Sequence, residues 1–132
     1  MAKRTESVIY LDTHVVAWLY DALVSRLSKA AEEAIERSSV LAASPMVRLE
    51  LQCLHEIGRI LDPPGEILAE LRQSIGLRES DPSLSVVVDS ALGIDWTRDT
   101  FDRLIVAEAQ HANAALVTKD IRIRDNYERA IW

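Results

Sequence analysis

Short, continuously apolar runs alternate with longer stretches of helical periodicity along this chain, and this alternation most limits the folds open to it. Val8–Leu11 and Val40–Ala43 are two such runs, and residues 115–118 form a third strand-like segment. Continuously apolar runs of about four residues are typical of strands that are covered on both faces. Strands that alternate with helices build right-handed βαβ units, so we predict an α/β fold with a parallel sheet between two layers of helices.

The segments between these runs have the apolar spacings of amphipathic helices. Ser44 followed by Pro45 is a favourable helix start, so we expect one helix to run from Pro45 to about Leu61. Residues 84–92 fit either a strand or a helix, and the spacing of their apolar residues behind a Ser83 cap favours the helix. The other predicted elements are helices over residues 15–20, 27–37, 65–75 and 99–113, and a short final strand over residues 130–132.

The composition is that of one globular domain. The chain has 132 residues, of which 48% are hydrophobic and 27% charged, so we predict a single domain over residues 1–132. No apolar run approaches the roughly 18 residues of a membrane span, and the start MAKRTES has basic residues without an apolar stretch behind them. A lone Cys53 excludes an internal disulfide framework. We therefore expect a cytoplasmic protein with no targeting segment and no membrane contact.

The net charge of −6 disfavours binding of nucleic acid by a uniformly basic surface. An acidic protein can still act on phosphates if its carboxylates gather around a divalent cation and its basic residues lie at the rim. The positions of the acidic residues therefore matter more than their number.

Two aspartates directly follow predicted strands. In an open parallel sheet the reactive crevice lies beyond the carboxyl ends of the strands. Asp12 follows Val8–Leu11, and Asp120 follows residues 115–118 after Lys119. Each aspartate could instead only cap the following helix, because Asp is a favoured N-cap residue. The sequence leaves both interpretations open.

Glu50 lies near the middle of the apolar arc of the helix predicted from Pro45. The other residues on this arc are Met46, Val47, Leu49, Leu51, Cys53, Leu54, Ile57, Ile60 and Leu61. An unpaired buried carboxylate is costly, so Glu50 needs a cation, a network of hydrogen-bond donors or a cavity that opens to water. The alternative is a structural salt bridge with an arginine of another helix.

Asp99 and Asp102 resemble the capping pair of a helix N-terminus, and they could also face one metal site there. Acidic residues from well-separated segments make sense together if they hold one or two Mg²⁺ or Mn²⁺ ions, which prefer oxygen ligands. The nearby basic residues could contact a phosphate backbone, although for at least two of them a solvated surface position is the simpler interpretation. These candidate substrate-binding residues are Arg98, Arg103, Lys119 and Arg122.

Four segments resemble, in order, the acidic motifs of PIN domains, and more closely those of the VapC branch, the toxins of bacterial type II toxin–antitoxin pairs. The segments are residues 10–19, 44–51, 96–107 and 116–120, which include the DTHVVAW and RDTFDRLI sequences. Thr100 stands where this family usually has proline. The resemblance covers nearly the whole chain.

The resemblance implies a three-layer α/β/α fold with about five strands and a metal-dependent endoribonuclease activity. By motif, the acids that hold Mg²⁺ or Mn²⁺ are Asp12, Glu50, Asp102 and Asp120, with Thr13, Asp99 and Thr118 in support. The implied reaction is hydrolysis of an RNA phosphodiester by metal-activated water. The implied partners are an RNA substrate, a VapB-like antitoxin that covers the active groove, and a second copy of the chain in a homodimer.

Two other functions fit part of this sequence. A receiver-like phosphoacceptor module also has an aspartate after its first strand, but it needs an acidic pair there, and only Asp12 follows Val8–Leu11. A catalytically silent binding protein with the PIN fold is the second alternative. It differs from the nuclease in whether the four acids gather around a metal.

Overall fold

The computed structural model describes residues 7–132, which contain a five-stranded sheet in the order β3-β2-β1-β4-β5. All neighbouring strands are parallel. The predicted α/β class with a parallel sheet is therefore confirmed. Residues 1–6, on which the prediction of no targeting segment rests, lie outside the described part of the chain. The strands are β1 (Val8–Leu11), β2 (Val40–Ala43), β3 (Arg78–Glu79), β4 (Ala115–Val117) and β5 (Ala130–Ile131).

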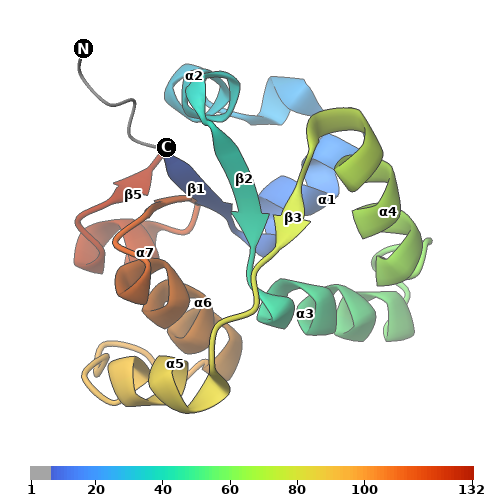
Figure 1. Ribbon diagram of the computed structural model, residues 1–132. Helices are drawn as coiled ribbons and strands as arrows, with labels where there is room; N and C mark the ends of the chain where they lie inside the picture. The colour runs from blue at the N-terminus through green and yellow to red at the C-terminus, as the bar shows by residue number, and fades with distance from the viewer. Residues whose placement is uncertain (1–6) are drawn as a thin grey trace.

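The strands pass through the middle of the molecule, and the helices lie around them (Figure 1). Helix α5 packs against α6, and α3 packs against both α4 and α6. Among residues 7–132, no helix is both long and apolar enough to cross a membrane. The helices are α1 (Thr13–Tyr20), the 3₁₀ turn η1 (Val24–Arg26), α2 (Lys29–Arg37), α3 (Pro45–Glu56), α4 (Pro64–Ile75), α5 (Leu84–Ala91), α6 (Thr100–His111) and α7 (Ile121–Asn126).

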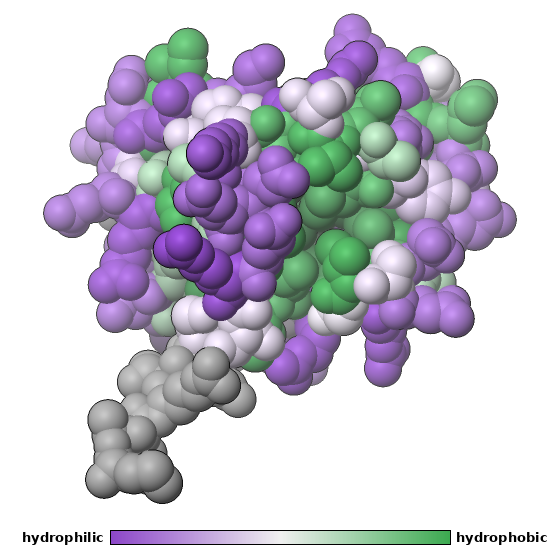
Figure 2. Space-filling view, turned by 90° about the horizontal axis from the view of Figure 1, so that it is seen from above, coloured by the Kyte–Doolittle hydropathy of each residue, from purple (hydrophilic) through white to green (hydrophobic). Residues whose placement is uncertain are grey.

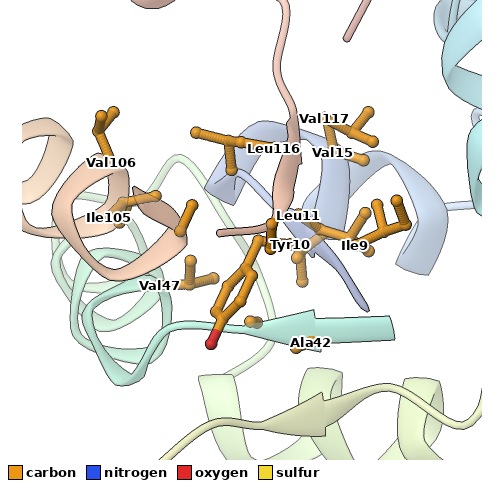
Figure 3. Close-up of a cluster of buried hydrophobic side chains, with 14 of the residues drawn as sticks. Ile9, Tyr10, Leu11, Val15, Ala42, Val47, Ile105, Val106, Leu116 and Val117 are labelled. Atoms are coloured by element: carbon orange, nitrogen blue, oxygen red, sulfur yellow. The ribbon is translucent and has the colours of Figure 1, made fainter. Parts of the chain in front are cut away.

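The core forms where the central strands meet the helices on the two sides of the sheet (Figure 3). Leu11 of β1 and Leu116 of β4 are fully buried, as are Val15 of α1 and Ile105 of α6. Both faces of the central strands are therefore covered, which explains why β1 has no alternation of polar and apolar residues. Burial of one such side chain contributes about 1.5 to 3 kcal/mol, so these short strands are held mainly by packing.

Helix α3 ends at Glu56, about one turn earlier than the sequence analysis predicts. The chain turns at Gly58, whose φ of 79° lies in the left-handed region that glycine adopts without strain. Three residues that the helical arc places on the buried face are exposed instead: Leu49 by 50%, Ile57 by 67% and Leu61 by 91%. Apolar periodicity therefore overestimates the buried face, because Leu49 is exposed within the helix and the apolar pattern continues through Ile57 and Leu61 after the helix ends.

Three short elements were not predicted: η1, β3 and α7. Strand β3 has two residues, both exposed, so it lacks the apolar run that marks the other edge and central strands. It pairs with the end of β2, and Glu79 forms an ion pair of 2.7 Å with Arg48 of α3. Helix α7 has six residues, which is too short for a periodic pattern to be recognised.

The chain order of the strands reverses between β1 and β4, which places a topological switch point there. Ligands of open parallel sheets bind in the crevice beyond the carboxyl ends of the strands at such a point. Leu11 pairs with Val117, and the Asp12 amide donates to the Val117 carbonyl at 3.0 Å. Asp12 and Thr118 therefore directly follow two adjacent strands, and they lie side by side.

Candidate active site

Asp12 is buried at the end of β1, with 6% of its surface exposed. Its Oδ1 accepts a hydrogen bond from the Thr13 amide at 2.8 Å, so it caps α1. The Thr118 hydroxyl donates to its other oxygen, Oδ2, at 2.6 Å. Burial raises the pKa of Asp12, and the hydrogen bonds from Thr118 and Thr13 oppose that rise. Both carboxylate oxygens are thus held in fixed positions at the switch point.

Glu50 reaches the same place from the second turn of α3. Its carboxylate accepts a hydrogen bond from the hydroxyl of Thr13, which is fully buried. The ion pair seen within residues 7–132 joins Arg48 and Glu79, so the structure does not give Glu50 the arginine salt bridge considered as an alternative. Burial raises the pKa of Glu50, the Thr13 hydrogen bond opposes this, and the negative charge of Asp12 adds to the rise.

Asp102 lies in the first turn of α6, half-buried, and interacts with all the other acids of the site. Burial and the charges of Asp99, Asp12, Asp120 and Glu50 raise its pKa to about 7. Within residues 7–132, no hydrogen bond to its carboxylate offsets these effects. Burial is the largest cause of this rise, and the charges of the neighbouring carboxylates add to it.

Asp99 and Asp120 both cap helices, at the starts of α6 and α7. Asp99 accepts from the Asp102 amide at 3.0 Å, and Asp120 accepts from the Arg122 amide at 2.8 Å. The N-cap interpretation is therefore correct for both, as it is for Asp12. A cap position also places each carboxylate at the mouth of a helix that begins at the site. The partial positive charge of these helix N-termini stabilises carboxylates there.

Thr97 is a supporting residue that the sequence analysis missed. Its buried hydroxyl oxygen accepts from the Asp99 amide at 3.1 Å, as the Thr118 hydroxyl oxygen accepts from the Asp120 amide at 3.1 Å. The two loops share one pattern, a threonine followed two residues later by a capping aspartate. This repeated spacing was the signal that could have identified Thr97.

The predicted basic residues differ in what they contact. Arg103 Nε donates to the Ala91 carbonyl at 3.0 Å, which holds this side chain against the end of α5. Arg98 Nη1 donates to the Asp95 carbonyl at 3.0 Å. Lys119 and Arg122 are exposed on either side of Asp120. Lys119 also lines a recess together with Asp12 and Asp120, and we call Lys119 and Arg122, the two basic residues that flank Asp120, the basic rim.

The donor set of the site is suited to a hard divalent cation, because it consists of carboxylate and hydroxyl oxygens. Among the described residues, no three His, Cys, Asp or Glu side chains already converge in an arrangement that would hold a metal ion. The charge that raises the pKa of Asp102 is the kind that a bound cation neutralises.

Thr118→Val is expected to destabilise the fold by about 1 to 3 kcal/mol, because it removes the hydroxyl that joins Asp12 to the Asp120 amide without changing the side-chain shape. Urea unfolding measures this loss. Thr100→Val, at an exposed position of α6, is the matched control and should change stability by less than about 0.5 kcal/mol. Equal effects of the two substitutions would mean that the Thr118 bridge adds nothing.

Comparison with known proteins agrees with this geometry. The PIN domain family model matches residues 9–129. Ribonuclease VapC22 of Mycobacterium tuberculosis (strain ATCC 25618 / H37Rv) is 36% identical over 125 residues, which cover 91% of this chain and 92% of that protein. The order and spacing of the acidic motifs are therefore accompanied by similarity along nearly the whole sequence.

Two solved structures share the fold at lower identity. VapBC2 from Rickettsia felis, bound to a DNA fragment from its promoter, has a chain that matches with a TM-score of 0.65 and 18% identity over 93% of this chain and 96% of that one. VapBC-1 from nontypeable Haemophilus influenzae matches with a TM-score of 0.62 and 17% identity over 89% and 93%. The chain belongs to the PIN domain family.

Proposed function

We propose that this protein is a VapC-like endoribonuclease that depends on Mg²⁺ or Mn²⁺, the toxin of a type II toxin–antitoxin pair. The observation that carries the proposal is that Thr13 and Thr118 hold the carboxylates of Glu50 and Asp12 at the switch point of the sheet, where Asp99, Asp102 and Asp120 add further negative charge. These carboxylates come from four separate parts of the chain. Similarity to the ribonuclease VapC22 extends over 91% of the sequence and supports the activity on RNA.

In this proposal Asp12, Glu50, Asp102 and Asp120 hold one or two divalent ions. When bound, such an ion lowers the pKa of a water molecule and offsets the charge that builds on the phosphate oxygens. Thr118 holds the Asp12 carboxylate and Thr13 holds the Glu50 carboxylate, so both acids are oriented before any ion binds. The basic rim of Lys119 and Arg122 contacts the RNA backbone.

Cleavage of RNA by the purified protein, free of any bound partner, tests the activity. A panel of messenger, transfer and ribosomal RNAs is incubated with Mg²⁺ or Mn²⁺, and a parallel set contains EDTA. We expect cleavage only when the metal is present, and we expect Asp12→Asn to cleave more slowly than the parent protein. Cleavage that persists in EDTA would overturn the metal-dependent mechanism.

Glu50→Gln is expected to weaken binding of Mn²⁺ by about tenfold or more while it changes the melting temperature of the metal-free protein little. The reason is that glutamine keeps an oxygen for the Thr13 hydroxyl but loses the charge that attracts a cation. Calorimetric titration with Mn²⁺ and thermal melting in EDTA measure the two effects. A large drop in melting temperature with unchanged Mn²⁺ affinity would mean that Glu50 is only structural.

The strand order and an RNA cleavage assay distinguish the two alternative functions. A receiver-like module has the strand order 2-1-3-4-5. The order found here, with β1 between β2 and β4, differs, and the chain belongs to the PIN family. Cleavage of RNA in the assay above would exclude a catalytically silent PIN-fold protein. Intact RNA under every metal condition would support one.

We further propose that the protein binds a VapB-like antitoxin, which covers the active groove, and that two copies of the chain form a homodimer. Two solved structures with this fold are those of VapBC2 and VapBC-1. The face seen in Figure 2 has a broad apolar area bordered by hydrophilic residues, a feature typical of protein interaction surfaces, whereas α5, at the bottom of Figure 1, lies on the far side of that view. Leu84, Val88 and Leu92 of the α5 region are exposed by 68%, 41% and 70%, and their spacing of four forms an apolar stripe suited to a second copy. Light scattering of the antitoxin-free protein measures whether it is a dimer.

A further inference from the structure

A recess of about 240 Å³ lies beside the carboxylates and is lined by Asp12, His14, Trp18, Lys119 and Asp120. We propose that this recess binds one nucleobase of the RNA, next to the phosphate that is cut, stacked against the ring pair of His14 and Trp18. The inference rests on the proposed ribonuclease function and adds to it a site that recognises single-stranded RNA through a base.

His14 and Trp18 are one turn apart on α1, so their rings lie on the same side of the helix. The ring centroids are 6.0 Å apart with an angle of 48° between the planes. The ring centroid of Trp132 also lies 6.0 Å from that of Trp18, with an angle of 52° between the two ring planes. The ring of Trp18 is therefore supported from the C-terminal end of the chain, and a ring held in place loses little freedom when a base stacks on it.

Two cations also lie against the Trp18 ring. The Lys119 Nζ is 5.8 Å from the ring centroid, and the Arg26 Cζ is 6.0 Å from it. Stacking of a base on an aromatic side chain is worth more than one exposed cation–π contact. A base that enters the recess can thus take the place of the Lys119 ammonium, which then becomes available to an RNA phosphate.

The position and the size of the recess select a base as its occupant. Asp12 and Asp120 belong both to the recess and to the carboxylate cluster, so a nucleotide whose phosphate lies at the carboxylates has its neighbouring base within reach. The volume is below the roughly 300 to 1,000 Å³ of sites for drug-sized ligands, which suits a single base. The net charge of −6 also leaves little general attraction for RNA, so stacking has to contribute to binding.

The test uses RNA octamers in which one position at a time lacks its base. Binding is measured in EDTA, where the RNA stays intact, by the quenching of tryptophan fluorescence. The variants are His14→Ala and Trp18→Phe, and the exposed His111→Ala on α6 is the matched control for the loss of an imidazole. Cleavage of the complete octamer by the parent protein in Mn²⁺ is measured separately.

We expect the parent and His111→Ala to lose about tenfold in affinity when one particular base is missing. In His14→Ala this loss should shrink to less than about threefold, because the stacking partner is gone. Equal losses in parent and His14→Ala, or no saturable quenching of the parent, would overturn the inference. A lower melting temperature of Trp18→Phe with the parent's pattern of losses would also overturn it, since the ring pair would then only anchor the C-terminus.

The Mn²⁺ assay separates this inference from the proposed function. If the parent cuts the octamer but no base position distinguishes it from His14→Ala, the base site is wrong and the ribonuclease stands. If the parent binds the octamer with the expected pattern but never cuts RNA, the site binds bases in a protein that is not a nuclease.

Discussion

Asp102→Asn is expected to lower the rate of RNA cleavage in Mn²⁺ by at least about a hundredfold. Asparagine keeps the size of the side chain and removes its charge. The Asp102 carboxylate interacts with the charges of Asp99, Asp12, Asp120 and Glu50, so it lies at the centre of the charge that would hold a cation. Single-turnover cleavage of a labelled RNA measures the effect, and the Mn²⁺ affinity of the variant shows whether the loss begins with the metal.

Asp99→Asn is the matched control, because Asp99 lies in the same helix start and asparagine caps helices as well as aspartate does. Its side chain is exposed and accepts from the Asp102 amide, so we expect it to retain cleavage within about tenfold of the parent. Equal losses in the two variants would mean that the charge of Asp99 is as important as that of Asp102. Near-parental cleavage by Asp102→Asn would remove Asp102 from the active site.

The parts of the fold that were predictable are those that burial imposes on the sequence. The strands β1, β2 and β4 are continuously apolar because both of their faces are covered, and this leaves a clear pattern. Glu50 was identifiable for the opposite reason, as a carboxylate within an apolar arc. The order of the acidic motifs then identified the family, which the comparisons confirmed.

The unpredicted parts depend on contacts that no local pattern contains. β3 exists because two exposed residues pair with the end of β2, and nothing in Arg78 or Glu79 indicates a strand. The end of α3 is set by the turn at Gly58, although apolar residues continue beyond it. The recess beside the carboxylates is lined by Trp18 and Lys119, which are far apart in the sequence and meet only in the folded chain.

For Asp12 and Asp120 the sequence leaves capping and a place in the site open as alternatives, and one position in the fold allows both. A strand that ends at the crevice is followed by a helix that begins there, so the residue between them is both an N-cap and a side chain of the site. Asp12 and Asp120 have this double position. Substitution by asparagine is therefore the informative change, because it keeps the cap and removes the charge.

In EDTA, Asp102→Asn is expected to be more stable than the parent at pH 8, by about 2 kcal/mol, and the difference should disappear near pH 4. The folded protein raises the pKa of Asp102 from 3.8 to about 7, so between these values the folded state binds a proton that the unfolded state has released. The stability of the parent therefore falls as the pH rises from about 4 to about 7 and is level above that.

The size of this effect follows from the shift. At about 1.4 kcal/mol per pH unit, the interval from 3.8 to about 7 gives an upper limit of about 4 kcal/mol. Screening by solvent reduces this value for a half-buried group. The variant also loses the attraction between a carboxylate and the N-terminus of α6, about 0.3 to 1 kcal/mol. These two corrections bring the expected gain to about 2 kcal/mol.

Urea unfolding of the parent and Asp102→Asn at pH 4, 6 and 8 in EDTA measures the difference, and Asp89→Asn on the exposed side of α5 is the control for removal of a carboxylate elsewhere. Addition of Mn²⁺ at pH 8 should then stabilise the parent more than the variant, because a cation that binds only the folded state stabilises it by mass action. The two effects have opposite signs, which separates repulsion within a cation site from an ordinary surface charge. A difference between parent and variant that is the same at all three pH values would mean that neither burial nor the neighbouring carboxylates raise the pKa of Asp102, and the site would then lack the charge density that a divalent ion requires.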